Sequence, residues 1–342
     1  MAGTAKFGVG IPNCREGLYF PPGFASPRQI VELAAQAERW GYDSVWTNDH
    51  YTPPHYVKKL WKDPPNFYEP LVTLSMVAGA TRDVKLAAGV IVLPIRDPLV
   101  LAKQACTLDA FSGGRLILGV GLGAYPEEFL AANPNSKVAE RPRFLEERLA
   151  ALKLLLTSRK ATFRGRYVNF QDVELFPRRR RGNLPVYIGG NAEKGIERAA
   201  KLGEGWIPTG LQPEELASKV RLLRRLARQN GRDGSRIEIA PQFVVCIGDT
   251  RAKAIELYKA STLFKHLSSL SETTFRGRVV EDTAMKNLTG TVDDVIDKVQ
   301  TFIDAGVQHF SAMLFLAKNL DEYRAGIRTF AKEVLPSFKR KR

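Results

Sequence analysis

The sequence predicts a closed (β/α)8 barrel, because short apolar segments alternate with longer amphipathic segments along most of its 342 residues. Each apolar segment is typical of a strand that is buried on both faces of a parallel sheet. The segments between them are long enough for the crossover helices that parallel strands require. The eight predicted strands are residues 7–12, 44–48, 85–94, 116–123, 185–190, 205–208, 237–247 and 310–315.

Capping residues mark the helices between these strands. Ser26 precedes Pro27 at the start of the first helix, and the Gln29 side chain can return a hydrogen bond to the backbone, as in a capping box. Gly41 supplies the end of this helix. The same kinds of signal start further helices at Asp97, Glu193 and Thr291.

The length is consistent with one barrel and two insertions. A barrel of this kind needs roughly 250 residues, and no linker rich in Pro, Gly or Ser divides the chain. We therefore expect a single domain over residues 1–342. Residues 161–177 are expected to form a hairpin that turns at Gly165 and Arg166. Residues 261–288 form a polar stretch without sustained periodicity, long enough for a lid.

The chain is basic, with 51 Lys and Arg against 36 Asp and Glu and a net charge of +15. Two runs, residues 178–181 and 339–342, carry eight of the basic residues. The others are spread over amphipathic helices such as residues 221–228, where they are expected to be solvated. This distribution favours a solvated surface over a nucleic-acid site, although a polyanion site stays open.

Cysteine and histidine usage argues against a disulfide framework and against a metal site. The three cysteines are odd in number and have no CxxC spacing, and the four histidines show no metal-binding motif. No run resembles a secretion signal or approaches the roughly 18 apolar residues of a membrane span. We expect a cytoplasmic protein that acts without a metal and away from the membrane.

Function in such a barrel is expected where the loops after the strands surround one pocket. His50, beside Asp49 at the end of the second strand, is the best candidate for acid–base chemistry, and a loop histidine without a task is the alternative. The loop of residues 189–191 precedes a helix, whose backbone N–H groups attract anions. This loop is a candidate phosphate site, with close strand–helix packing as the alternative.

Four stretches, in this order and spacing, resemble the bacterial-luciferase-like oxidoreductases. This family consists of barrel enzymes that use reduced FMN or the deazaflavin coenzyme F420, and the resemblance covers nearly the whole chain. The matching stretches are residues 41–50, 89–94, 112–121 and 186–191.

The resemblance implies roles for particular residues. His50 matches the catalytic histidine of the family, and Gly89-Val90 matches a bulge with a non-prolyl cis peptide behind the central ring of the cofactor. Thr209 matches a residue near the cofactor phosphate. The full set of cofactor-binding residues implied in this way is Asp49, Gly89, Val90, Tyr125, Gly189, Gly190, Asn191 and Thr209.

The residues leave the choice of cofactor open. The Gly89-Val90 pair resembles F420 users, whereas Ala124 stands where related F420-dependent dehydrogenases carry a glutamate. We slightly favour a monooxygenase that uses reduced FMN, supplied by a flavin reductase, on a small organic substrate. The second possibility is hydride transfer with F420 and His50 as the proton partner. The third is a non-catalytic binder of a cofactor or polyanion. The resemblance also implies a homodimer.

Overall fold

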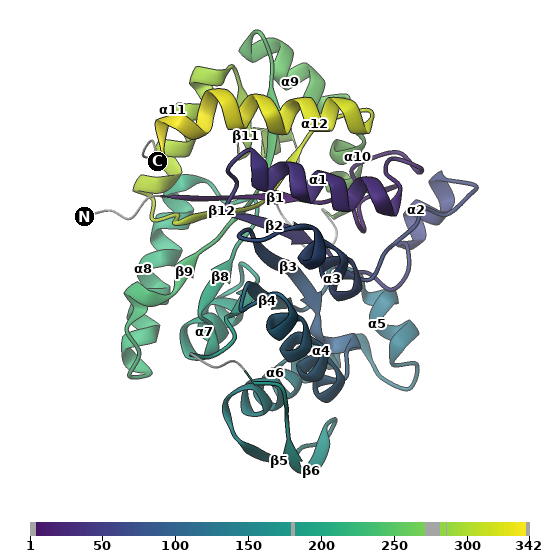
Figure 1. Ribbon diagram of the computed structural model, residues 1–342, viewed down its shortest axis with the longest axis vertical. Helices are drawn as coiled ribbons and strands as arrows, with labels where there is room; N and C mark the ends of the chain where they lie inside the picture. The colour runs from purple at the N-terminus through teal and green to yellow at the C-terminus, as the bar shows by residue number, and fades with distance from the viewer. Residues whose placement is uncertain (1–4, 179–181, 271–280, 285, 340–342) are drawn as a thin grey trace.

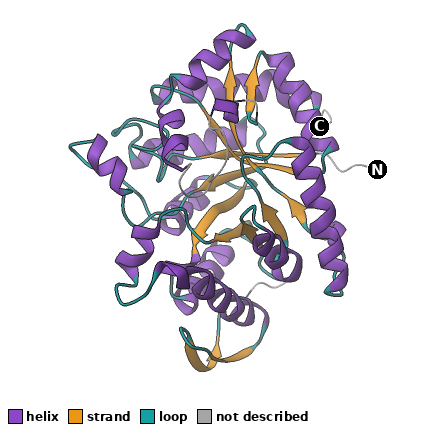
Figure 2. Cartoon of the chain, turned by 180° about the vertical axis from the view of Figure 1, so that it is seen from behind, coloured by secondary structure: helices purple, strands orange, loops and turns teal. Residues whose placement is uncertain are grey.

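The computed structural model describes residues 5–178, 182–270, 281–284 and 286–339. Its main sheet is parallel throughout, in the order β11-β10-β12-β1-β2-β3-β4-β7-β8-β9, with the helices outside it (Figures 1 and 2). The strands of this sheet are β1 (Lys6–Gly10), β2 (Ser44–Thr47), β3 (Lys85–Val92), β4 (Leu116–Gly121), β7 (Val186–Gly189), β8 (Gly205–Ile207), β9 (Glu238–Ile239), β10 (Gln242–Ile247), β11 (Leu288–Gly290) and β12 (His309–Phe315).

The sheet curls and closes through β9 and β10, which together make one interrupted strand. On one side, the Ala240 N–H donates to the Trp206 carbonyl of β8 at 2.8 Å, and the Gln242 N–H donates to the Pro208 carbonyl directly after β8 at 3.1 Å. On the other side, the Ser311 N–H of β12 donates to Pro241 at 3.0 Å. The predicted strand over residues 237–247 is therefore this interrupted strand, and the predicted (β/α)8 barrel is confirmed.

Helices cover the outside of the barrel and begin at the predicted caps. In α1, the Ser26–Gln29 capping box is present, and Asp97 and Thr291 cap α4 and α11 with their side chains. The long helices are α1 (Pro27–Arg39), α3 (Pro70–Ala80), α4 (Pro98–Phe111), α6 (Arg141–Thr157), α7 (Glu193–Leu202), α8 (Pro213–Gln229), α11 (Val292–Asp304) and α12 (Leu320–Thr329). The shorter ones are α2 (His55–Leu60), α5 (Pro126–Ala132), α9 (Arg251–Lys259) and α10 (Thr262–Leu270).

Two segments stand outside the βα repeat. Strands β5 (Lys160–Arg164) and β6 (Asn169–Glu174) pair antiparallel around a turn in which the Gly165 N–H donates to Val168 at 2.9 Å. The expectation of an aperiodic polar stretch is wrong for the start of residues 261–288, because α10 buries Leu263, His266 and Leu267 at helical spacing. Residues 271–280 of the expected lid and residues 179–181 and 340–342 of the basic runs lie outside the described residues.

Side chains fill the barrel at the amino-terminal ends of its strands. His309 lies between Ser44, whose Oγ is 2.7 Å from Nε2, and Glu238, whose Oε2 is 3.2 Å from Nδ1. The Trp46 indole N–H donates to the same Ser44 Oγ at 2.7 Å. Burial alone would raise the pKa of Glu238, but the hydrogen bond and charge of His309 and the Lys6 ammonium group hold that pKa below its usual range. This network occupies the end of the barrel opposite the predicted site.

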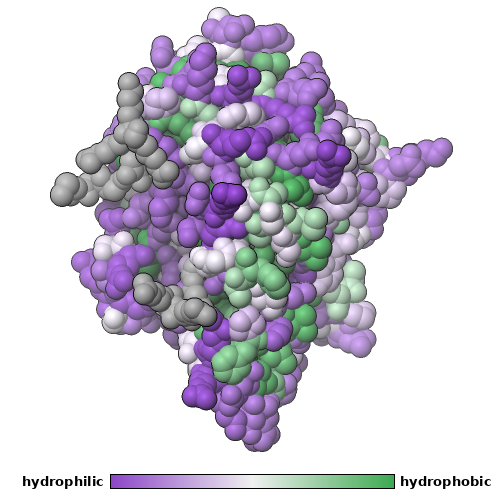
Figure 3. Space-filling model, in the orientation of Figure 1, coloured by the Kyte–Doolittle hydropathy of each residue, from purple (hydrophilic) through white to green (hydrophobic). Residues whose placement is uncertain are grey.

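Apolar side chains gather on one outer face, over α3 and α4 (Figure 3). Val72 and Met76 of α3 and Val100 and Phe111 of α4 are exposed, Phe111 by 85%. Within the described part of the chain, no helix combines the length and the apolar character that crossing a membrane requires.

Candidate active site

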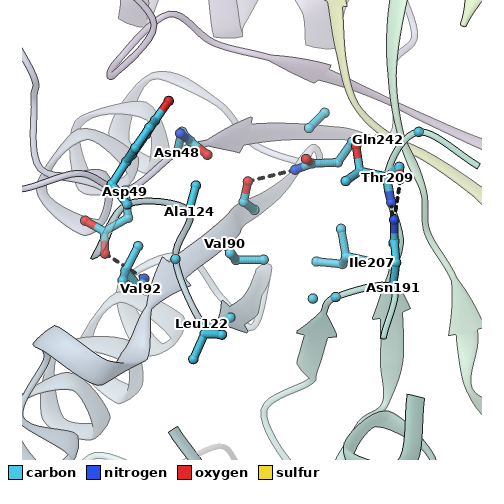
Figure 4. A pocket seen from close by; sticks show the side chains of 18 of the residues that line it. Asn48, Asp49, Val90, Val92, Leu122, Ala124, Asn191, Ile207, Thr209 and Gln242 are labelled. Carbon is cyan, nitrogen blue, oxygen red and sulfur yellow. Dashed lines mark hydrogen bonds between the residues drawn. The ribbon is translucent and has the colours of Figure 1, made fainter. Parts of the chain in front are cut away.

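A cavity of about 630 Å³ opens at the carboxyl ends of the barrel strands (Figure 4). It brings together all of the site residues predicted from the sequence, although they come from five separate loops or strands. Those residues are Asp49, His50, Gly89, Val90, Tyr125, Gly189, Gly190, Asn191 and Thr209.

The middle of the cavity is built on β3. The Gly89–Val90 peptide bond is cis, as the resemblance implied. The Gly89 carbonyl accepts a hydrogen bond from the Gln242 side chain of β10, with Nε2 at 2.7 Å (Figure 4). A Cβ atom at Gly89 would lie 2.8 Å from the Trp46 ring, so a side chain does not fit there. Gln242 was not predicted, because its role depends on a contact with a residue far away in the sequence.

Glycines of β4 and β7 lie directly beside the Val90 side chain, so no side chain from these two positions covers it. A Cβ atom at Gly121 would lie 2.7 Å from a Val90 methyl group, and one at Gly189 would lie 3.0 Å from the other. Val90 and Ile207 point into the cavity from neighbouring parts of the barrel (Figure 4). A surface of this kind, apolar and without projecting side chains on β4 and β7, fits one face of a flat ring system.

The α7 end of the cavity has the donors that an anion requires. No side chain caps α7 at Ala192, so among the described residues no side chain accepts from the N–H groups of its first turn, of which Gly195 donates to the Ala192 carbonyl at 2.8 Å. Arg141 and Arg198 also line the cavity. Arg198 pairs with Glu146 at 2.9 Å, while its Nε is buried without a hydrogen-bond partner among the described residues. These two arginines were not predicted from the sequence, because neither belongs to a recognised motif.

Two hydrogen bonds between Asn191 and Thr209 hold the loop before α7 in place. The Asn191 side chain donates to the Thr209 carbonyl at 2.6 Å and accepts from the Thr209 N–H at 3.0 Å (Figure 4). Both polar atoms of the Asn191 amide are therefore engaged. We infer that Asn191 positions the loop, and that a phosphate here would meet backbone N–H groups in place of this side chain.

Asp49 is also engaged by its surroundings. Its carboxylate is buried, forms an ion pair with Arg96 and accepts the Val92 N–H at 2.9 Å (Figure 4). Glu69 pairs with the other side of Arg96 at 3.0 Å. Asp49 thus joins the loop after β2 to the end of β3, while the neighbouring His50 lines the cavity with an imidazole.

His50 is backed by a buried carboxylate. Nδ1 of His50 lies 3.3 Å from Oε2 of Glu128. The other oxygen of Glu128, Oε1, accepts the Tyr51 N–H at 2.5 Å. Glu128 is 2% exposed and belongs to α5, after β4. The pairing orients the imidazole and leaves Nε2 as the nitrogen that Glu128 does not engage. Glu128 was missed because the sequence separates it from His50 by 78 residues.

Tyr125, the residue before α5, and His266 of α10 line another wall of the cavity, and Tyr56 of α2 lies behind them. Nδ1 of His266 lies 2.5 Å from the Tyr56 hydroxyl and 3.3 Å from the Tyr125 hydroxyl. Burial, helped by the positive charge of Arg15 and by His50, lowers the pKa of His266 to about 3. His266 is therefore a neutral hydrogen-bonding group at physiological pH.

The low pKa of His266 predicts a pH-dependent stability. Between pH 6.5 and about 3, the unfolded chain binds a proton at His266 that the folded protein does not bind, so the free energy of unfolding falls as the pH decreases. One such proton changes that free energy by about 1.4 kcal/mol per pH unit. In His266→Gln, urea unfolding at pH 6, 5 and 4 should show a shallower decline, by up to this slope.

The matched control for this measurement is His55→Gln, which removes an exposed histidine from α2. It should decline with pH as the parent protein does. If His266→Gln and the parent lose stability equally between pH 6 and 4, His266 is not held neutral in the folded protein.

Comparisons with known proteins agree with this geometry. The family model of luciferase-like monooxygenases matches residues 5–309. An F420-dependent glucose-6-phosphate dehydrogenase from Kineococcus radiotolerans is 26% identical over 324 residues, which cover 91% of this chain and 93% of that protein.

Two solved structures are similar in fold. An F420-dependent secondary alcohol dehydrogenase, in complex with an F420–acetone adduct, has a TM-score of 0.79 at 22% identity and covers 99% of this chain and 100% of its own. The oxygenating constituent of the 3,6-diketocamphane monooxygenase from Pseudomonas putida, in complex with FMN, has a TM-score of 0.74 at 18% identity with the same coverage. These relatives use F420 or FMN. By its family match and by its fold, this chain belongs to the luciferase-like monooxygenase family.

Proposed function

We propose that this protein is an F420-dependent oxidoreductase that moves a hydride between the deazaflavin and an alcohol or carbonyl carbon of a small molecule. The observation that carries this proposal is the pair of His50, which lines the cavity, with the buried Glu128 behind it. A carboxylate that engages one imidazole nitrogen leaves the other for the substrate, which suits a group that must take up a hydroxyl proton as a hydride leaves. The F420-dependent dehydrogenase from Kineococcus radiotolerans, aligned over nine-tenths of both chains, supports the same choice.

Different parts of the cavity wall would contact the ring and the phosphate of such a cofactor. The surface around Val90 would lie against the ring, and the first turn of α7, with Arg198, would hold the phosphate. F420 supplies a carbon that accepts or gives a hydride. When an alcohol loses a hydride from its carbinol carbon, Nε2 of His50 would take up the hydroxyl proton as the C=O bond forms. Glu128 steadies the imidazolium.

A reduced-FMN monooxygenase is the second candidate, and the composition of the cavity wall favours it. Ala124 places no carboxylate at its position, while Tyr19, Tyr125 and the neutral His266 line the same cavity. Such a wall limits water near the ring, which protects reactive oxygen chemistry. A flavin reductase partner, a homodimer and a cytoplasmic location stay predictions from the family resemblance.

The proposed chemistry is tested by turnover without oxygen. Reduced F420 should be oxidised anaerobically by at least one member of a panel of small aldehydes and ketones. The recovery of F420 absorbance measures this oxidation. Oxygen uptake with reduced FMN and product formation, in the absence of any F420 turnover, would overturn the proposal in favour of the monooxygenase. A tight F420 complex that never turns over would overturn it in favour of a binding protein.

His50 provides a mutational test of the same proposal. His50→Ala should lower hydride transfer by roughly 10²–10⁴, because it removes the proton partner, while the affinity for F420 changes much less. The control His55→Ala removes an exposed histidine and should turn over as the parent does. Parental turnover in His50→Ala would contradict the assigned role, and an equal loss in folding and activity would assign His50 to structure.

The phosphate site is tested by Arg198→Gln. Gly190 has a φ of 127°, so a side chain there would strain the backbone whether or not a phosphate binds. Removing the Arg198 charge avoids this problem and should weaken F420 binding about tenfold or more, since hydrogen bonds to charged groups contribute about 1.5–3 kcal/mol. Binding of the same deazaflavin without its phosphate should not change.

Arg225→Gln, an exposed position on α8, is the control for the loss of one positive charge. It should leave binding of both deazaflavins at the parental level. If Arg198→Gln weakens the two deazaflavins equally, or neither of them, the phosphate does not lie beside Arg198.

A further inference from the structure

We infer that Arg15 forms an anion subsite in the same cavity, which takes a carboxylate of the substrate. The inference rests on the proposed function for the identity of the reacting carbon, but the anion site itself depends only on Arg15 and its surroundings. It narrows the substrate class from any small alcohol or carbonyl compound to one that carries a carboxylate.

Arg15 is buried in the cavity wall without a hydrogen-bond or ion-pair partner among the described residues. Its side chain follows β1, the residue is 4% exposed, and it lines the cavity. Among the residues that the structure describes, its guanidinium group forms no hydrogen bond or ion pair, and Nε is fully buried without a partner. A buried charge that lacks a partner is costly. A negatively charged ligand group in the cavity would remove this cost.

The carboxylates closest in sequence or in the cavity wall are engaged elsewhere. Glu16 accepts the N–H groups of Gly23 at 2.9 Å and Ala25 at 3.3 Å. Asp49 pairs with Arg96, and Glu128 is taken up by His50 and a backbone N–H group. None of the three therefore neutralises Arg15. His266, which also lines the cavity, is neutral, and Lys286 adds a second positive side chain to the lining.

The geometry at Arg15 favours a planar carboxylate. The guanidinium carbon lies 4.7 Å from the centre of the Tyr19 ring, so one face of the group is covered, and no hydrogen bond within the described chain occupies its N–H donors. A planar fork of N–H donors matches the two oxygens of a carboxylate. A phosphate has its own donors at the α7 end of the cavity.

Arg15 and His50 stand on two loops that are joined firmly. The Asn13 side chain donates to the Asn48 carbonyl at 2.8 Å and accepts the Asn48 N–H at 2.8 Å. The loops after β1 and β2 are thus joined directly before Arg15 and His50. A substrate bound by its carboxylate at Arg15 would present its reacting carbon at a fixed place relative to His50, which is the positioning that catalysis requires.

The test compares charged and neutral ligands of the same shape. We would titrate the F420-loaded protein and the cofactor-free protein by calorimetry with 4-oxopentanoate and 6-oxoheptanoate, and with the amides of both acids. We expect at least one acid to bind at least tenfold more tightly than its amide to either form. Arg15→Gln should lose this preference, and Arg15→Lys should retain part of it, because Lys keeps the charge without the fork.

Arg28→Gln, an exposed residue of α1, is the matched control for net charge and should retain the full preference. Equal binding of acid and amide by the parent protein, or an unchanged preference in Arg15→Gln, would overturn the inference. If Arg15→Gln does not fold, the inference is tested by the preference for acid over amide in the parent protein and in Arg15→Lys. The preference of the cofactor-free protein persists even if F420 fails to bind, so failure of the proposed function is distinguished from failure of this inference.

Discussion

Closure of one all-parallel sheet is the constraint on which the candidate site depends. Because the strands run in the same direction around the barrel, their carboxyl ends meet at one rim and their loops share one cavity. Closure depends on the interrupted strand β9–β10, which bonds to β8 on one side and to β12 on the other. The same strand places Gln242 against the Gly89 carbonyl, so the contact that closes the barrel also shapes the middle of the cavity.

Charge divides the cavity along its length. At one end, the uncapped first turn of α7 and Arg198 attract an anion, and at the other Arg15 is a buried cation without a partner in the described chain. Between them lie the apolar surface around Val90 and the His50–Glu128 pair. A cofactor phosphate and a substrate carboxylate would then be kept apart, with the reacting atoms held near His50.

The sequence was sufficient for those features that depend on neighbouring residues. Apolar runs predicted the barrel strands, and Ser26, Asp97 and Thr291 predicted helix starts, because each signal lies within a few residues of its effect. The site residues at the strand ends, and those that the family resemblance implies, were predictable from the sequence. Glu128 and Gln242 were not, since their partners are 78 and 153 residues away. Helix α10 was not predicted, because serines and a histidine interrupt its apolar residues. Its buried face is recognised only from its packing in the cavity wall.

The central claim is that F420 lies with its ring on the surface around Val90 and its phosphate at the first turn of α7. A crystal structure of the F420 complex tests this most directly. The account predicts the ring in contact with Val90 and the phosphate within hydrogen-bond distance of backbone N–H groups of residues 191–194. A phosphate bound at Arg15, or a ring that lies away from Val90, would contradict it.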